Sequence, residues 1–111
     1  MAKVMVVLMS IRKSDLASLQ RNATAAVAML GALANERRLM ILCLLIADEE
    51  VTAGELADAV GLSQSACSQH LAKMREEGLV ATRRDAQTIF YRIADRNVAR
   101  ILMLLKSIYC P

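Results

Sequence analysis

The segment from Leu62 to Leu71 combines small polar side chains with helical spacing. Cys67, Leu71 and Met74 fall at i, i+4 and i+7, so we expect them to pack inward. Short groups that donate and accept hydrogen bonds can approach base edges in the major groove without steric conflict. The pattern therefore indicates a helix that reads duplex DNA. Its polar face consists of Gln64, Ser65, Ser68, Gln69 and, at the edge, His70.

A basic segment follows at the distance where a winged domain contacts the DNA backbone. It comprises two predicted strands and their turn, with Arg83, Arg84, Gln87 and Arg92. Lys73 and Arg75, later in the helix, are also placed to reach phosphates. A small polar helix face alone is equally typical of an ordinary surface helix. The basic hairpin beside it favours a winged helix-turn-helix that binds double-stranded operator DNA.

Several other polar residues have plain structural interpretations. His70 is the only histidine, and a lone histidine is more typical of hydrogen bonding than of metal binding. Cys67, at an inward position, is interpreted as a small core residue. Arg37 and Arg38 occupy the first turn of a helix, where the helix dipole disfavours cations. We expect them to pair with acids, with a phosphate contact as the alternative. The acidic run at 48–50 is expected to be a solvated turn.

The composition bounds the class of protein. The chain has 111 residues, of which 56% are apolar but only 3% aromatic, which fits one helical domain with an aliphatic core. The apolar fraction is high for a small monomer and suggests that a partner covers part of it. A net charge of +3 suits an anionic partner. No carboxylate pair, phosphate loop or activated nucleophile indicates an enzyme.

The cysteines and the apolar runs indicate a cytoplasmic protein. Three cysteines without close spacing do not form a disulfide framework. The longest apolar runs, Val4 to Met9 and Leu39 to Ala47, are too short to span a bilayer, so no membrane partner is expected. The first run weakly resembles a signal peptide but lacks a cleavage site. We therefore assign residues 1–13 to a leader, either disordered or due to a start codon placed too far upstream, and residues 14–111 to the domain.

Five helices and one hairpin are predicted to position the polar residues. The first helix runs over residues 14–33. The second follows the N-cap Asn35 and is apolar on all sides over Leu39–Ala47, which predicts a place at the centre of the fold. The third opens with a capping box from Thr52 to Glu55 and ends at Gly61. Its expected inward residues are Leu56, Ala57 and Val60.

The rest of the chain supplies the reading helix, the hairpin and a last helix. Ser63 caps the reading helix and Gly78 ends it, strands cover 79–84 and 88–93, and Asp95 caps the last helix. The first and last helices carry more apolar surface than one small domain needs, so they are the predicted dimer interface. The fold class is mainly α with a small β-hairpin, a winged helix-turn-helix that dimerises through its first and last helices.

Five segments of the chain resemble the ArsR/SmtB family of winged-helix repressors. They are Ala34 to Cys43, Ala53 to Leu56, Ser63 to Leu71, Glu77 to Val80 and Ile89 to Ile93. The resemblance covers roughly residues 16–110. It implies a homodimer that binds an imperfect inverted repeat and pairs through the first and last helices.

The resemblance also suggests what controls the protein. The arsenic-type site of the family needs thiols where this chain has Ala57-Asp58-Ala59, and the zinc-type site needs a histidine absent from Asp95-Arg96-Asn97. Cys43 and Cys110 instead resemble the sulfide- and persulfide-responsive branch of the family. In that branch the reduced dithiol form binds DNA, and reactive sulfur species join the two cysteines by a disulfide or polysulfide. Cys67 has no counterpart in that pair.

Other interpretations remain open at the level of sequence. Cys43 and Cys110 can be unreactive, in which case the regulator acts by competition with another DNA-binding protein. A haem or metal sensor is a further alternative, with ligands among Cys43, Cys67, His70 and Cys110, although no cofactor is implied by a motif. A winged helix that binds protein rather than nucleic acid is the last.

Overall fold

The computed structural model describes residues 11–110, which divide into two units at Gly31. Most of the predicted leader, residues 1–13, therefore lies outside the described residues. The first unit contains α2 (Lys13–Arg21) and the larger part of α3 (Ala23–Leu33). Leu16, Leu19, Val27 and Leu30 of these helices each expose more than half of their surface. Exposed apolar side chains in this number are typical of a surface suited to contact with another chain.

Asn22 separates the two N-terminal helices. Its side-chain amide donates a hydrogen bond to the carbonyl of Ser18 at 2.9 Å, and its backbone N–H bonds to the carbonyls of Ser18 and Leu19. A short amide side chain that bonds to the backbone offers the chain an alternative to continued helix. The prediction of one helix over residues 14–33 was therefore wrong, although the two helices together cover nearly the same range, Lys13 to Leu33.

The second unit contains α4 (Glu36–Asp48), which begins at the predicted N-cap. The side chain of Asn35 accepts hydrogen bonds from the N–H groups of Arg37 and Arg38 at 3.0 and 3.1 Å. Ile41, Leu42 and Leu45 are fully buried, because α5 and β3 pack against that face. One face of the helix therefore lies in the core, as its predicted central place requires, but the other face is exposed in this chain alone. Met40 and Cys43 are exposed there.

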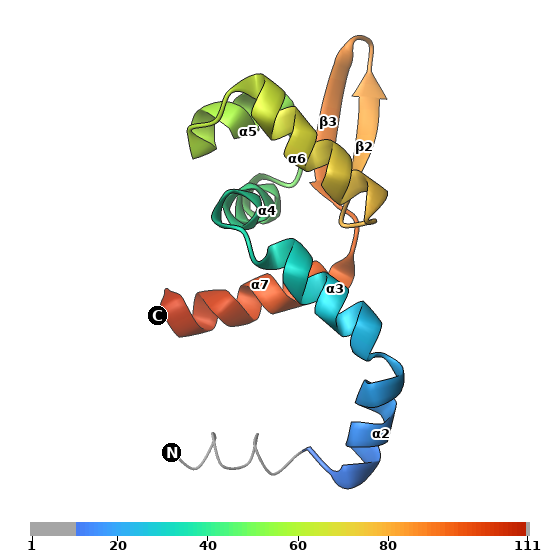
Figure 1. The fold of residues 1–111 in the computed structure, drawn as a ribbon. Coiled ribbons are helices and arrows are strands. Elements are labelled where there is room, and N and C mark those ends of the chain that lie inside the picture. Colours follow the sequence, from blue (N-terminus) through green and yellow to red (C-terminus); the bar gives the residue numbers. More distant parts are fainter. Residues whose placement is uncertain (1–10, 111) are drawn as a thin grey trace. The chain divides into compact units, whose positions relative to one another are not determined.

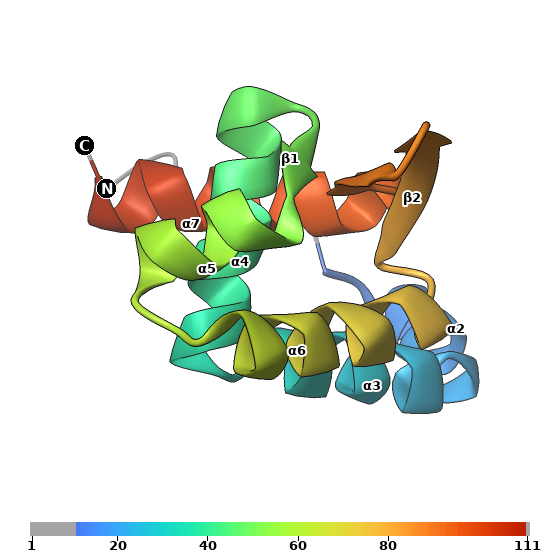
Figure 2. The same cartoon turned by 90° about the horizontal axis from the view of Figure 1, so that it is seen from above.

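Two short helices follow, α5 (Ala53–Val60) and α6 (Gln64–Glu76), which lie next to each other (Figures 1 and 2). Thr52 caps α5 by accepting from the N–H of Glu55 at 3.2 Å. Gly61 ends α5 with a φ of 70°, a left-handed conformation that glycine adopts without strain. Both features agree with the sequence prediction. The three expected inward residues of α5 are buried, as predicted: Leu56, Ala57 and Val60.

A three-stranded antiparallel sheet follows, in the order β1-β3-β2. Strands β2 (Val80–Asp85) and β3 (Thr88–Ile93) form the predicted hairpin, which extends beyond α6 in Figure 1. Strand β1 (Val51–Thr52) pairs with the other edge of β3, with Val51 opposite Tyr91. Two residues carry no alternating pattern, so the sequence did not predict this strand.

The last helix, α7 (Arg96–Tyr109), begins at the predicted cap Asp95, whose carboxylate accepts from the N–H of Asn97 at 2.8 Å. Val98 and Leu102 are buried within the second unit. A second row of apolar side chains on α7 stays exposed: Met103, Leu104, Ile108 and Tyr109. None of the described helices is both long and apolar enough to cross a membrane.

Candidate nucleic-acid interface

The helix α6 is fixed to the second unit by its apolar face. Cys67, Leu71 and Met74 have no exposed surface, as the sequence predicted. The hydroxyl of Ser63 accepts a hydrogen bond from the N–H of Ala66 at 3.1 Å and caps the first turn. A capped helix with one buried face holds its opposite face in a fixed direction.

The opposite face of α6 carries the predicted DNA-reading residues. Gln64, Ser65, Gln69 and Lys73 are exposed on it, whereas Ser68 and His70 are half-buried. All belong to one helix of thirteen residues, so the structure brings them together on a surface slim enough for the major groove. Their individual roles in DNA contact stay predictions.

The turn between α5 and α6 is held from α4. The Arg37 guanidinium donates a hydrogen bond to the carbonyl of Val60, the last residue of α5. Gly61 follows immediately, and a Cβ atom there would lie 3.8 Å from Nη1 of Arg37. The prediction that Arg37 pairs with an acid was therefore wrong, because its guanidinium donates a hydrogen bond to the carbonyl at the end of α5 instead. Arg38 does face an acid, Glu77, at 3.9 Å.

The hairpin β2–β3 forms the wing next to this helix, and Figure 2 shows it beside the C-terminal end of α6. Its register pairs Arg84 with Ile89 and Asp85 with Thr88 across a two-residue turn. Ala86, in that turn, has a φ of 55°. Arg84, Gln87 and Arg92 are exposed on the wing. Exposed arginines beside a reading helix are suited to phosphate contacts.

Arg83 differs from its neighbour Arg84, because it is bound within the protein. Its Nε and Nη2 atoms donate to the two carboxylate oxygens of Glu50 at 2.9 and 3.2 Å, and its guanidinium lies 4.9 Å from the centre of the Phe90 ring. The hydrogen bond from Arg83 lowers the pKa of Glu50, and the same carboxylate raises the pKa of Arg83. The expectation that residues 48–50 form only a solvated turn was wrong for Glu50.

The three cysteines have two different environments. Cys67 is buried beneath α6, and burial raises the pKa of its thiol, which agrees with its predicted place in the core. Cys43 and Cys110 are both exposed. Partial burial raises the pKa of Cys43, and the negative charge of a Cys110 thiolate raises it further. Charge effects weaken with distance, so this one indicates that α4 and the end of α7 approach each other in the fold, although the two cysteines are distant in sequence.

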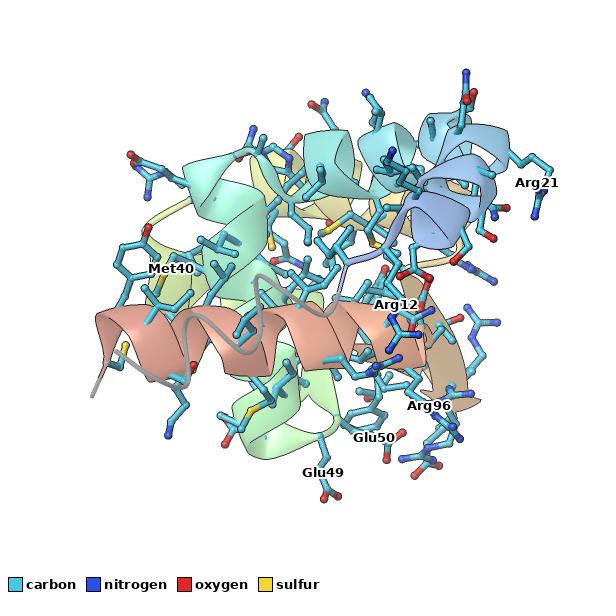
Figure 3. The ribbon with its side chains drawn as sticks, turned by 90° about the horizontal axis from the view of Figure 1, so that it is seen from below. Arg12, Arg21, Met40, Glu49, Glu50 and Arg96 are labelled. Atoms are coloured by element: carbon cyan, nitrogen blue, oxygen red, sulfur yellow. The ribbon has the colours of Figure 1, made fainter. Side chains whose placement is uncertain are left out.

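One apolar side chain near Cys43 is that of Met40. Met40 lies one turn before Cys43 on the open face of α4, and Figure 3 shows it beside the C-terminal turns of α7, the end that carries Cys110. Within residues 11–110, no three His, Cys, Asp or Glu side chains gather so as to hold a metal ion.

The capped helix α6, the turn that precedes it and the basic hairpin define a winged helix-turn-helix DNA-binding domain. Residues 35–82 match the model of the arsR family of bacterial regulatory proteins. The regulator YgaV of Escherichia coli (strain K12) is 49% identical over 98 residues, 88% of this chain and 99% of the relative. The chain belongs to the arsR family and is a DNA-binding transcriptional regulator, not an enzyme. The predicted family and fold class are confirmed.

Other relatives include both activators and repressors. The transcriptional activator HlyU of Vibrio cholerae is 49% identical over 96 residues, 86% of this chain and 88% of the relative. A solved structure of reduced HlyU covers 85% of this chain and 98% of that chain, with 48% identity and a TM-score of 0.78. The crystal structure of the transcriptional repressor BigR from Xylella fastidiosa aligns with 91% of this chain and 99% of its own chain, with 33% identity and a TM-score of 0.79.

Proposed function

We propose that this regulator binds operator DNA as a homodimer while its thiols are reduced, and leaves the DNA when Cys43 and Cys110 are joined by sulfur. The observation that carries the proposal is that Cys43 and Cys110 are both exposed free thiols, whereas Cys67 is buried. Exposure gives a small sulfur donor access to both. The reduced state of the HlyU structure supports the view that thiol state is a variable in this branch.

The inducer in this proposal is a persulfide, RSSH. With one persulfide, the two thiols become a disulfide, and the products are RSH and H₂S. The cysteines lose two electrons and the sulfane sulfur gains them. With two persulfides, one extra sulfur is retained as a trisulfide, and the products are two RSH and one H₂S. A direct disulfide requires Cα atoms within about 7 Å, whereas an inserted sulfur relaxes that limit.

The homodimer in this proposal pairs through the exposed apolar rows of the N-terminal helices and of α7. Each row consists of side chains that solvent contact disfavours. A solved relative, Mb0332 of Mycobacterium bovis, is described as a homodimeric winged helix-turn-helix DNA-binding domain. A dimer presents two α6 helices to successive major grooves, about 34 Å apart. We place this protein in the cytoplasm, with residues 14–111 as the DNA-binding domain.

The DNA contacts in this proposal divide by chemistry. The polar face of α6, with Gln64, Ser65, Ser68 and Gln69, contacts base edges, and Gln69 is suited to adenine. Cationic and peripheral groups contact phosphates. The second group consists of His70, Lys73, Arg84 and Gln87. Arg83, predicted to belong to it, is engaged by Glu50 in the reduced protein.

The test uses reduced protein, half of which is treated with glutathione persulfide. Intact mass and affinity for a duplex selected by the protein from a random pool are measured on both halves. The expected result is a mass that fits a Cys43–Cys110 disulfide or trisulfide and an affinity lower by about 5- to 150-fold, the usual range of allosteric coupling. Cys43→Ser and Cys110→Ser remove the response, and Cys67→Ala retains it.

Two outcomes contradict the proposal. In the first, the bridged protein binds the duplex as tightly as the reduced protein. In the second, Cys43→Ser responds to persulfide as the unmodified protein does. Either outcome favours a second candidate, a regulator with silent thiols that acts by competition. The raised pKa of Cys43 supports that candidate, because it reduces the reactive thiolate.

A further inference from the structure

The contact between Glu50 and Arg83 spans the whole three-stranded sheet. Glu50 directly precedes β1, whereas Arg83 lies in β2, and β3 lies between these strands. Phe90 of β3 is opposite Thr52 on one side and Arg83 on the other. The guanidinium passes over the Phe90 ring to reach the carboxylate. One ion pair therefore ties both edges of the sheet across its middle strand.

The geometry of this contact restricts Arg83. A guanidinium held by two parallel hydrogen bonds and an aromatic ring has a fixed orientation. Its charge is balanced by a carboxylate of the same chain. Arg84, one residue closer to the tip of the wing, has no ion pair within residues 11–110. The two adjacent arginines are thus in different states.

The turn that carries Glu50 supports the same distinction. Glu49 has a φ of 62°, and Glu50 N–H donates to the carbonyl of Asp48 at 2.7 Å. Figure 3 shows the side chains of Glu49 and Glu50 leaving this turn in different directions, with Glu50 on the side of the strands. The turn after α4 therefore places the carboxylate of Glu50 next to Arg83 of the wing.

We propose that Glu50 and Arg83 are a positioning pair that fixes the direction of the wing, and that Arg83 does not contact DNA phosphate. Arg84, beyond the pair toward the tip of the wing, supplies a phosphate contact instead. The pair acts on DNA binding, which the family establishes, and is independent of the proposed sulfur response.

The experiment measures the affinity of fully reduced protein for the selected duplex over a series of salt concentrations. The variants are Glu50→Gln, Arg83→Gln, the double variant, and Arg84→Gln as the matched arginine control. A lost phosphate contact lowers the slope of log affinity against log salt by about 0.9. A lost positioning pair lowers the affinity without that change of slope.

We expect Glu50→Gln and Arg83→Gln each to weaken binding about two- to fivefold with an unchanged slope, the size of effect that an exposed ion pair supports. The double variant is no weaker than the weaker single variant, because both remove one contact. Arg84→Gln lowers the slope by about 0.9. Glu50→Gln also speeds hydrogen exchange of the amides in residues 80–93, a readout of wing order.

The opposite results overturn the proposal. If Arg83 contacts phosphate, Arg83→Gln lowers the slope as Arg84→Gln does, and Glu50→Gln binds DNA more tightly because a competing anion is gone. Unchanged affinity in both variants also overturns it. The charge-swapped protein, Glu50→Arg with Arg83→Glu, provides a further check. Positioning predicts that the swap restores affinity relative to Arg83→Glu alone, and phosphate contact predicts that it does not.

Discussion

Two cysteines with raised pKa values differ in what raises them. Burial is the larger cause for Cys43 and the only one for Cys67, but Cys43 remains exposed and has Cys110 as a second cause. A thiol reacts with sulfur electrophiles as its thiolate. At the scale of the residue, the surroundings of Cys43 therefore slow its reaction while leaving it accessible.

The pH dependence of Cys43 alkylation follows from these two causes. A raised pKa means less thiolate at any lower pH, so the rate in the Cys67→Ala protein should keep rising through pH 9.0, the ordinary thiol value. Adding Cys110→Ser should move the midpoint downward only in part, since burial remains. Iodoacetamide rates at Cys43, followed by peptide mass spectrometry, measure both midpoints. An identical midpoint with and without Cys110 would show that the thiols do not interact.

Short local signals decide the boundaries of the elements. Asn35, Thr52, Ser63 and Asp95 all act as the N-caps that the sequence predicted, since a cap needs only its own following turn. The break at Asn22 has an equally local cause, but a single amide inside an apolar stripe is ambiguous in sequence.

The cap of the reading helix gives a prediction with a control in the same turn. Ser63→Ala removes the acceptor for the Ala66 N–H and should lower the free energy of unfolding by about 0.5–2 kcal/mol. Ser65→Ala, an exposed hydroxyl two residues later, should change it by less than about 0.5 kcal/mol. Urea unfolding measures both. Equal losses in the two variants would argue against capping as the cause.

Contacts between elements that are distant in the chain could not be predicted from the sequence. Glu50 and Arg83 are 33 residues apart, and neither position shows which of the neighbouring acids and arginines pairs with the other. The proximity of Cys43 and Cys110 also depends on how α4 and α7 fold together. The family resemblance, not spacing, suggested that pair. By contrast, the polar face of α6 could be predicted from the sequence, because all of its residues belong to one helix and follow its spacing.

The wing should loosen in acid. The pKa of Glu50 is lowered in the folded protein, so its ion pair stabilises the wing above the ordinary carboxyl value of about 4.5 and is lost as the pH falls through the lower folded value. NMR signals of Phe90 and Tyr91 should shift with a midpoint below pH 4.5. Glu50→Gln should lack this transition, and its persistence in that variant would assign it to another group.

At the scale of the whole molecule, several apolar side chains of the second unit remain exposed to solvent. Val98 and Leu102 of α7 are buried, whereas Leu104 and Ile108 each expose more than half of their surface. These two residues are four apart and form one row along the helix. The proposed homodimer covers this row, and the spacing of its two α6 helices on DNA then depends on α7.

A charge on this row should separate the subunits. Ile108→Asp should give a monomer of 12.2 kDa and weaken binding to the selected duplex, because half of the DNA contacts are lost. Ser107→Asp, an equal charge on a polar position of the same turn, should remain dimeric. Light scattering after size exclusion measures the mass of each. A dimeric Ile108→Asp protein would place the interface elsewhere.

The hydrogen bond from Arg37 to Val60 has a mechanical consequence. Arg37 and Cys43 belong to the same helix, about 9 Å apart along its axis. The first turn of α4 is thus hydrogen-bonded to the turn that leads into α6, and Cys43, near the middle of α4, is exposed and can be joined to another residue. A sulfur bridge at Cys43 that tilts α4 would therefore also shift the turn at Val60 and the start of α6. Such a coupling acts over about 1.7 helical turns of α4, without a relay through the core.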